Sequence, residues 1–163
     1  LYQSIGKNNT KSERNFMDEE LIEFIKEYHR CMHKWNFALE YYSKKEGISY
    51  TTFKILGVIF TTENCTQKDI YEAISIPKQT INAAITDFYK KGYVKLVEPP
   101  EDRRVKIIRL TEKGKKYAEG IFSKIMDCEC KAINEIGKEK IKTYINAMNS
   151  YVELLLKSIK ELY

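Results

Sequence analysis

A run of polar side chains in the middle of the chain carries hydrogen-bonding chemistry. Gln79 and Asn82 each present a carboxamide that can make paired hydrogen bonds with the edge of an adenine. Thr80 and Thr86 can reach phosphates or thymine methyl groups, and Lys78 can meet a phosphate. The polar outer face of any surface helix has a similar composition, so the run alone leaves both interpretations open.

A second candidate group follows two prolines and consists of Asp102, Arg103 and Arg104. An arginine at a protruding turn can enter the minor groove of DNA, where negative potential is concentrated. Asp102 could hold such an arginine through a charge-assisted hydrogen bond. An ordinary charged turn is the alternative, but the polar helix and the charged turn together favour nucleic-acid binding more than either does alone.

Metal and redox chemistry have weaker support. His29 and His33 stand at i and i+4, which could form half of a Zn²⁺ site, but they are the only two histidines. We expect packed or surface histidines and no metal. We expect Cys31, Cys128 and Cys130 to be buried, inert thiols. A redox- or metal-responsive sensor on the same scaffold stays open as the alternative.

Catalysis has no candidate machinery. The sequence shows no nucleophile paired with a base, no paired catalytic carboxylates and no Gly-x-Gly loop. We therefore predict that the protein is not an enzyme and needs no cofactor.

The composition is that of a single cytoplasmic domain. Hydrophobic residues make up 43% of the 163, enough to bury a core. The net charge of +5 permits a polyanionic partner but is too small to demonstrate one. Without an apolar run of about 18 residues or a signal peptide, we expect no membrane partner.

Periodicity predicts six helices and two strands. Apolar residues at alternating steps of four and three indicate long helices at both ends of the chain. Thr66 and Asp69 form a capping-box pattern that opens a short helix with Ile70, Ala73 and Ile74 inward. Pro77 should occupy the first position of the next helix, which buries Ile81, Ile85 and Phe88 and ends before Gly92. The β-branched segments 93–97 and 105–110 predict a hairpin, and Thr111 caps a helix that turns Cys128 and Ala132 inward.

These segments resemble the MarR (multiple antibiotic resistance regulator) family of winged helix-turn-helix transcription factors. Asp102-Arg103-Arg104 followed by Leu110-Thr-Glu-Lys-Gly114 is similar to the family's D-x-R and L-T-x-x-G wing motif. Residues 77–94 resemble its recognition helix and the exit into the first wing strand. The resemblance covers about residues 18–162 in element order, and its specific motifs lie within 66–114. It implies an obligate, triangular homodimer whose two winged lobes read a palindrome.

The resemblance also implies a set of residues at double-stranded DNA. The preceding helix would touch the backbone, the second helix would face the major groove, and the wing would carry an arginine with its brace. The implied residues are Gln67, Lys68, Lys78, Gln79, Thr80, Asn82, Ala83, Thr86, Asp102, Arg103 and Arg104. Two departures matter: many relatives have a basic residue where this chain has Ala83, and Asp87 adds a negative charge.

The terminal helices independently predict a dimer, because each carries an apolar seam too long for a small lobe to cover. Packing of the two helices within one chain is the alternative. The residues expected at the dimer interface are Leu21, Ile25, Ile145, Met148, Val152, Leu155 and Ile159.

An effector site is implied by the family, whose members often bind small aromatic anions in a cleft between the dimer helices and the lobe. Ordinary core packing is the alternative for the aromatic residues involved. The candidates are Tyr28, Trp35, Tyr50, Phe53 and Tyr117.

The expected fold is therefore mainly α, with a winged helix-turn-helix lobe, a two-stranded wing and a dimerisation region made by the N- and C-terminal helices. Residues 1–17 should form a flexible extension, 18–48 and 115–163 the dimerisation helices, and 49–114 the lobe. The expected function is a homodimeric transcriptional regulator, a repressor that binds a palindromic operator and is released by a small-molecule effector.

Overall fold

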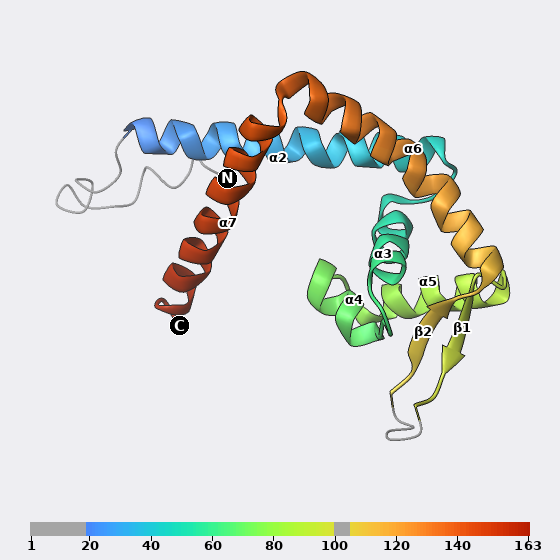
Figure 1. The fold of residues 1–163 in the computed structure, drawn as a ribbon. Coiled ribbons are helices and arrows are strands. Elements are labelled where there is room, and N and C mark those ends of the chain that lie inside the picture. The colour runs from blue at the N-terminus through green and yellow to red at the C-terminus, as the bar shows by residue number, and fades with distance from the viewer. Residues whose placement is uncertain (1–18, 100–104) are drawn as a thin grey trace. The chain divides into compact units, whose positions relative to one another are not determined.

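A computed structural model of the chain describes residues 19–99 and 105–163 (Figure 1). Two compact units meet in sequence at Thr51 and Thr52. The elements are α2 (Glu19–Lys45), α3 (Tyr50–Thr61), α4 (Gln67–Ile74), α5 (Lys78–Lys90), β1 (Val94–Val97), β2 (Ile107–Leu110), α6 (Glu112–Ile136) and α7 (Lys138–Lys160). This order confirms the predicted mainly α fold with its two-stranded wing.

The first unit contains α2, whose ends match the helix dipole. Glu19 and Glu20 lie in its first turn, and Lys44 and Lys45 lie in its last. Of its large apolar side chains, Leu21 and Trp35 are each more than half exposed. The charges at the two ends of α2 therefore favour the helix, while part of its apolar surface stays exposed.

The core of the second unit holds the helix-turn-helix together. Ile81, Ile85 and Phe88 of α5 are buried, as the spacing predicts, and so is Ile70 of α4. The expectation that Ala73 points inward is wrong, because it is exposed. The inward side of the two-turn helix α4 runs through Ile70 toward half-buried Ile74, and Ala73 lies on the other side of Ile70.

Side-chain caps fix the start of α4. The Thr66 backbone N–H donates to Asp69 Oδ2 at 2.8 Å, and the Asp69 N–H donates to Thr66 Oγ1 at 3.3 Å. These bonds confirm the capping box and lower the pKa of the Asp69 carboxyl, the side-chain hydrogen bond from Thr66 contributing most. Ser75 ends α4 in the left-handed region at φ +47°.

Pro77 occupies a different position from the one expected. It is the N-cap of α5 rather than its first helical residue, because its ψ of 136° is extended. Its carbonyl oxygen accepts the N–H groups of Thr80 and Ile81 at 2.9 and 3.2 Å. Pro77 thereby ends the turn and begins the helix in one residue.

The wing is an antiparallel pair tied to both neighbouring helices. Val94 pairs with Leu110, and Val97 pairs with Ile107. At the base of the wing, the Thr111 N–H donates to the Tyr93 carbonyl at 2.9 Å. Its hydroxyl donates to the Gly92 carbonyl at 2.7 Å. The same hydroxyl oxygen accepts the Gly114 N–H at 3.0 Å and caps α6.

Gly114 permits this close approach. A Cβ at Gly114 would lie 1.9 Å from the Tyr93 carbonyl oxygen, far inside van der Waals contact. The Leu110-Thr-x-x-Gly114 pattern thus has a physical cause: threonine supplies the cap, and glycine leaves room for the backbone of Tyr93, the residue before β1.

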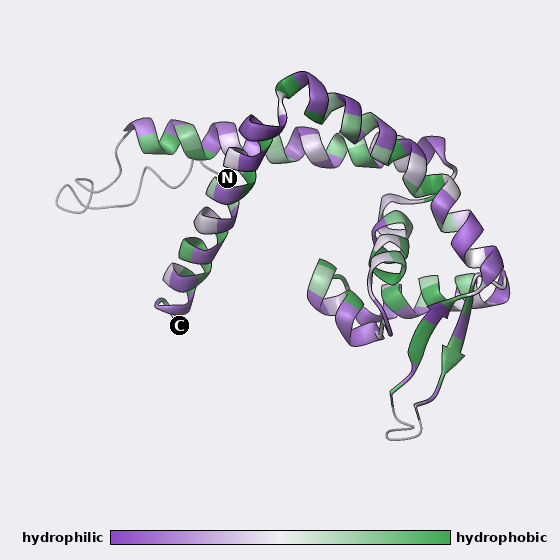
Figure 2. Cartoon of the chain, in the orientation of Figure 1, coloured by the Kyte–Doolittle hydropathy of each residue, from purple (hydrophilic) through white to green (hydrophobic). Residues whose placement is uncertain are grey.

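Beyond the lobe, α6 and α7 lose contact with the core. Ala118 and Ile121 of α6 are buried, whereas Cys128 and Ala132 are exposed. The prediction that Cys128 and Ala132 point inward is wrong, because the core packs only against the first half of α6. Helix α7 has no buried residue, and Figure 2 shows apolar residues along its length. In the parts of the chain described, no helix has the length and apolar character needed to cross a bilayer.

A glycine pair on α6 tests the wing-base contact. Gly114→Ala should lower the free energy of unfolding by about 3 kcal/mol, the upper end of overpacking costs. Gly120→Ala is the matched control, because no atom lies within 4 Å of its added Cβ. It should raise the free energy of unfolding by about 0.5–1 kcal/mol through helix propensity. Urea unfolding at one protein concentration measures both changes, and a neutral Gly114→Ala variant would refute the contact.

Candidate nucleic-acid interface

The outward face of α5 is a single polar stripe. An α-helix advances about 100° per residue, so Gln79, Ala83, Thr86 and Lys90 align on the side opposite the buried core residues. All four are exposed. Asn82 is exposed beside this stripe. Lys90 is an addition to the predicted set, which its spacing from Gln79 could have revealed.

The starts of α4 and α5 form one surface. The Lys78 ammonium lies 5.8 Å from the centre of the Tyr71 ring, a cation–π distance. Tyr71 is 44% exposed and was absent from the predicted set, since its place in the sequence gave no signal of the contact. A pocket of about 470 Å³ between the two helices is lined by Gln67, Lys68, Tyr71, Glu72, Lys78 and Ile81. The structure thus brings Gln67, Lys68 and Lys78 together.

Asp87 lies on the flank of α5 beside Thr80 rather than on the stripe. Its carboxylate is 2.7 Å from the Lys91 ammonium, and this hydrogen bond raises the pKa of Lys91. The negative charge noted in the sequence is therefore paired with a cation one turn further along the helix. Both groups are exposed, so the pair contributes little to stability.

The start of α4 also lies beside the two residues that precede β2. Thr66, Gln67 and Lys68 line a hollow of about 450 Å³ with Val105 and Lys106. Lys106, which is not among the residues predicted from the sequence, adds a cation here, and its ammonium lies 4.0 Å from the Glu98 carboxylate. Asp102, Arg103 and Arg104 lie outside the described residues.

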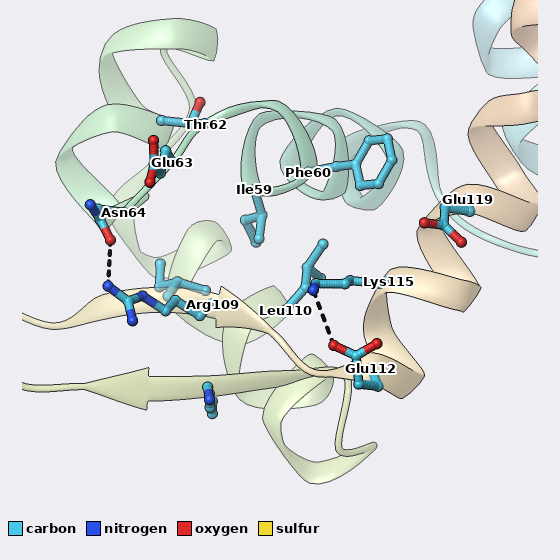
Figure 3. Close-up of a pocket in the computed structure, with 12 residues that line it drawn as sticks. Ile59, Phe60, Thr62, Glu63, Asn64, Arg109, Leu110, Glu112, Lys115 and Glu119 are labelled. Atoms are coloured by element: carbon cyan, nitrogen blue, oxygen red, sulfur yellow. Dashed lines mark hydrogen bonds and ion pairs between the residues drawn. The ribbon is translucent and has the colours of Figure 1, made fainter.

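A further pocket of about 510 Å³ lies on the α3 side of the wing (Figure 3). Its apolar wall includes Ile59, Phe60 and Leu110, and charged groups of both signs surround it. Arg109 donates to Asn64 Oδ1 at 2.6 Å, and Lys115 is paired with Glu112 at 3.0 Å. No residue of α5 lines this pocket, so it is separate from the polar stripe.

The thiols differ from expectation. Cys31, Cys128 and Cys130 are exposed, so the prediction that they are buried is wrong. Cys31 lies beside the apolar seam of α2, and the other two lie where α6 has left the core. Cys65 is the buried thiol, and burial with the nearby Asp69 charge raises its pKa to about 11. A thiol with that pKa is almost entirely protonated at neutral pH and therefore a poor nucleophile.

The two histidines lie together on α2. His29 and His33 share one surface with Glu23, Lys26 and Arg30. Among the residues described, no group of three histidine, cysteine or carboxylate side chains is placed to hold a metal ion.

The five aromatic effector candidates fall in both units. Phe53 is buried against Phe122, with ring centres 5.2 Å apart. Tyr117 stacks on Tyr93 at 4.3 Å with the rings 9° from parallel. Both therefore have packing roles in the lobe. In the first unit, Tyr28 and Tyr50 are half-buried and Trp35 is exposed.

Most of the residues expected at a dimer interface are exposed in the single chain. Met148 is half-buried and the other six are exposed. Those six are Leu21, Ile25, Ile145, Val152, Leu155 and Ile159.

Sequence comparison connects this geometry to known proteins. Residues 46–105 match the sequence profile of the MarR family. The regulator SarZ of Staphylococcus haemolyticus is 32% identical over 74 residues, which are 45% of this chain and 50% of that protein. The repressor YetL of Bacillus subtilis is 30% identical over 98 residues, 56% of this chain and 59% of that protein. The chain thus spans about half the length of the curated relatives it matches.

Solved structures share the fold over most of the chain. A MarR family regulator from Neisseria meningitidis is 23% identical, with a TM-score of 0.72 over 90% of this chain and all of that one. Staphylococcus aureus MarR, solved with salicylate and kanamycin, is 24% identical, with a TM-score of 0.69 over 85% of this chain and 95% of that one. The chain therefore has the winged helix-turn-helix fold of these MarR family regulators, and its residues 46–105 match the sequence profile of that family.

Proposed function

We propose that this chain is a DNA-binding transcriptional regulator. It acts as a repressor that binds a palindromic operator as a homodimer and is released by a small-molecule effector. The outward face of α5 is the observation that carries the proposal. Exposed amide and hydroxyl side chains follow one side of a helix whose other side is anchored in the core by Ile81, Ile85 and Phe88.

In the proposed complex, α5 lies in the major groove of DNA and α4 crosses the sugar-phosphate backbone. Gln79 and Asn82 reach base edges, while Gln67 and Lys68 meet phosphates. Lys78 and Lys90, at the two ends of α5, are placed to meet the phosphates that border the groove. Because Asp87 is already paired with Lys91, its repulsion of DNA is reduced.

The wing supplies a second contact in this proposal. Arg104, braced by Asp102, would enter the adjacent minor groove, where the negative potential is strongest, and Arg103 would add positive charge beside it. Lys106, which directly precedes β2 at the end of the wing away from Thr111, adds to the positive charge beside α4. We propose the cytoplasm as the location of the protein, because the proposed partner is DNA.

The homodimer is supported by apolar surface that the single chain leaves uncovered. Helix α7 buries none of its residues, although Leu155, Val152 and Ile159 recur along one seam. Segments 18–48 and 115–163 would form the dimerisation region, and 49–114 the reading lobe. Two-fold symmetry then sets half-sites about one turn of DNA apart.

Effector release is supported by relatives and by aromatic residues. Structures with the same fold have been solved with salicylate and kanamycin and with p-coumaroyl-CoA. We propose a small aromatic or anionic effector, for which Tyr28, Trp35 and Tyr50 of the first unit are candidate contacts.

A redox-responsive regulator is the second candidate, favoured by the exposure of Cys31, Cys128 and Cys130. In that case peroxide would release the chain from DNA, and replacement of these thiols by serine would abolish the release.

The base-reading role of α5 predicts a difference between specific and random DNA. The specific duplex is one that the unmodified chain selects from a randomised library. Gln79→Ala and Asn82→Ala should each weaken binding to this duplex by about 1–3 kcal/mol and should weaken binding to random DNA much less. Lys90→Ala is the matched control on the same helix. It should weaken binding to both duplexes and lower the slope of log affinity against log salt by about one. Fluorescence anisotropy titrations measure the affinity of all three variants. If Gln79→Ala loses equal affinity for both duplexes, Gln79 contacts the DNA backbone and not a base.

The dimer seam predicts a difference between neighbouring leucines. Leu155→Glu should destroy the dimer and specific DNA binding together, because a buried, unpaired carboxylate costs several kcal/mol and a symmetric dimer contains two. Leu154→Glu is the control, since Leu154 is 64% exposed and lies off the seam. Sedimentation and a DNA titration on the same samples measure both. A Leu155→Glu dimer that still binds DNA would place the interface elsewhere.

A further inference from the structure

The centre of the α5 stripe is a methyl group. Ala83 lies between Gln79 and Thr86 on the outward face, and all three are exposed. The only cations of α5 are Lys78 and Lys90, its first and last residues, and α5 contains no arginine. The part of the helix that would lie deepest in a groove therefore offers carboxamides, a hydroxyl and methyl groups.

This composition restricts which bases can be read. Guanine is most often recognised by a basic side chain that bonds to its O6 and N7 atoms, and the centre of α5 has none. Carboxamides match the donor and acceptor of adenine, and alanine and threonine methyl groups match the 5-methyl group of thymine. Alanine is also short, so it lets the helix backbone approach the base edges closely.

The backbone that carries Ala83 is held firmly. Ile81 and Ile85, two residues before and after it, are 1% and 3% exposed, and the intervening helix is regular. An alanine has no side-chain rotamers, so the position of its methyl group is set by this backbone alone. A methyl group forms no hydrogen bond, so it can distinguish base pairs only by apolar contact. The 5-methyl group of thymine is recognised by such a contact.

Resting on the proposed function, we propose that the half-site beneath the centre of α5 consists of A·T pairs. Ala83 and Thr86 contact thymine 5-methyl groups there, and Gln79 and Asn82 bond to the adenines. The chain therefore recognises this part of its operator without a guanine contact.

Selection followed by removal of single methyl groups tests the inference. The full chain is used to select duplexes from a randomised library, and A·T pairs should be enriched at the central positions of each half-site. In the selected duplex, thymine is then replaced by uracil at one of those positions at a time. Binding should weaken about fourfold for each contacted methyl group removed, the effect of burying one such group.

Two alanines of α5 make the test specific. Ala83→Gly should abolish the difference between thymine and uracil at one position. Ala84→Gly also removes one alanine methyl group and lowers helix propensity equally, but on the half-buried side of α5. It should leave the difference in binding between thymine and uracil duplexes intact. Ala83→Arg, selected against the same library, should acquire guanine where the parent chain selects thymine.

The outcomes separate this inference from the function on which it rests. Enrichment of a palindrome with central G·C pairs, or equal binding of thymine and uracil duplexes, would overturn the inference and leave a DNA-binding regulator. A chain that enriches no sequence and binds every duplex alike would overturn the proposed function itself.

Discussion

The backbone carbonyl of Tyr93 is the point on which the arrangement of the lobe depends. Tyr93 lies between α5 and β1, and its carbonyl accepts the N–H of Thr111, which immediately precedes α6. Around it, Lys113 donates to the Lys91 carbonyl at 2.8 Å and its ammonium lies 5.1 Å from the centre of the Tyr93 ring. The end of α5, both wing strands and the start of α6 are therefore fixed to one another. A side chain at Gly114 would occupy the same space as this carbonyl, which explains the glycine.

For the proposed function, such a fixed junction matters because a helix that reads bases must be held in a constant position. The wing begins at the same junction, so the distance between α5 and the base of the wing is set by short hydrogen bonds rather than by a long loop. On its opposite side β2 is also held, because the Ile108 N–H donates to the Cys65 carbonyl at 2.7 Å, one residue before the cap of α4. Both helices of the helix-turn-helix are thus connected to the wing through backbone groups.

The sequence predicted the elements that local physics determines. Thr66 with Asp69, Thr111, and the spacing of Ile81, Ile85 and Phe88 each act within a few residues, and the structure confirms them. The predictions of burial are wrong where burial depends on how far the core of the lobe extends along α6. Cys128 and Ala132 fit an inward spacing on α6, but no lobe reaches them. The Tyr71–Lys78 contact was not predictable, since it depends on how two helices pack. The position of Pro77 differs by one residue because a proline can serve as a cap as well as a first turn.

The central claim is that α5 lies against DNA bases through its outward stripe, and nuclear magnetic resonance of the side-chain amides measures this directly. With a duplex that the chain has selected from a random library, the NH₂ resonances of Gln79 and Asn82 should shift and their protons should exchange more slowly with solvent. The methyl resonance of Ala83 should shift as well. With a random duplex, the shifts should concentrate at lysine side chains and backbone amides of α4. If the selected duplex instead leaves the Gln79, Asn82 and Ala83 signals unchanged while those of another surface move, α5 is not the reading element.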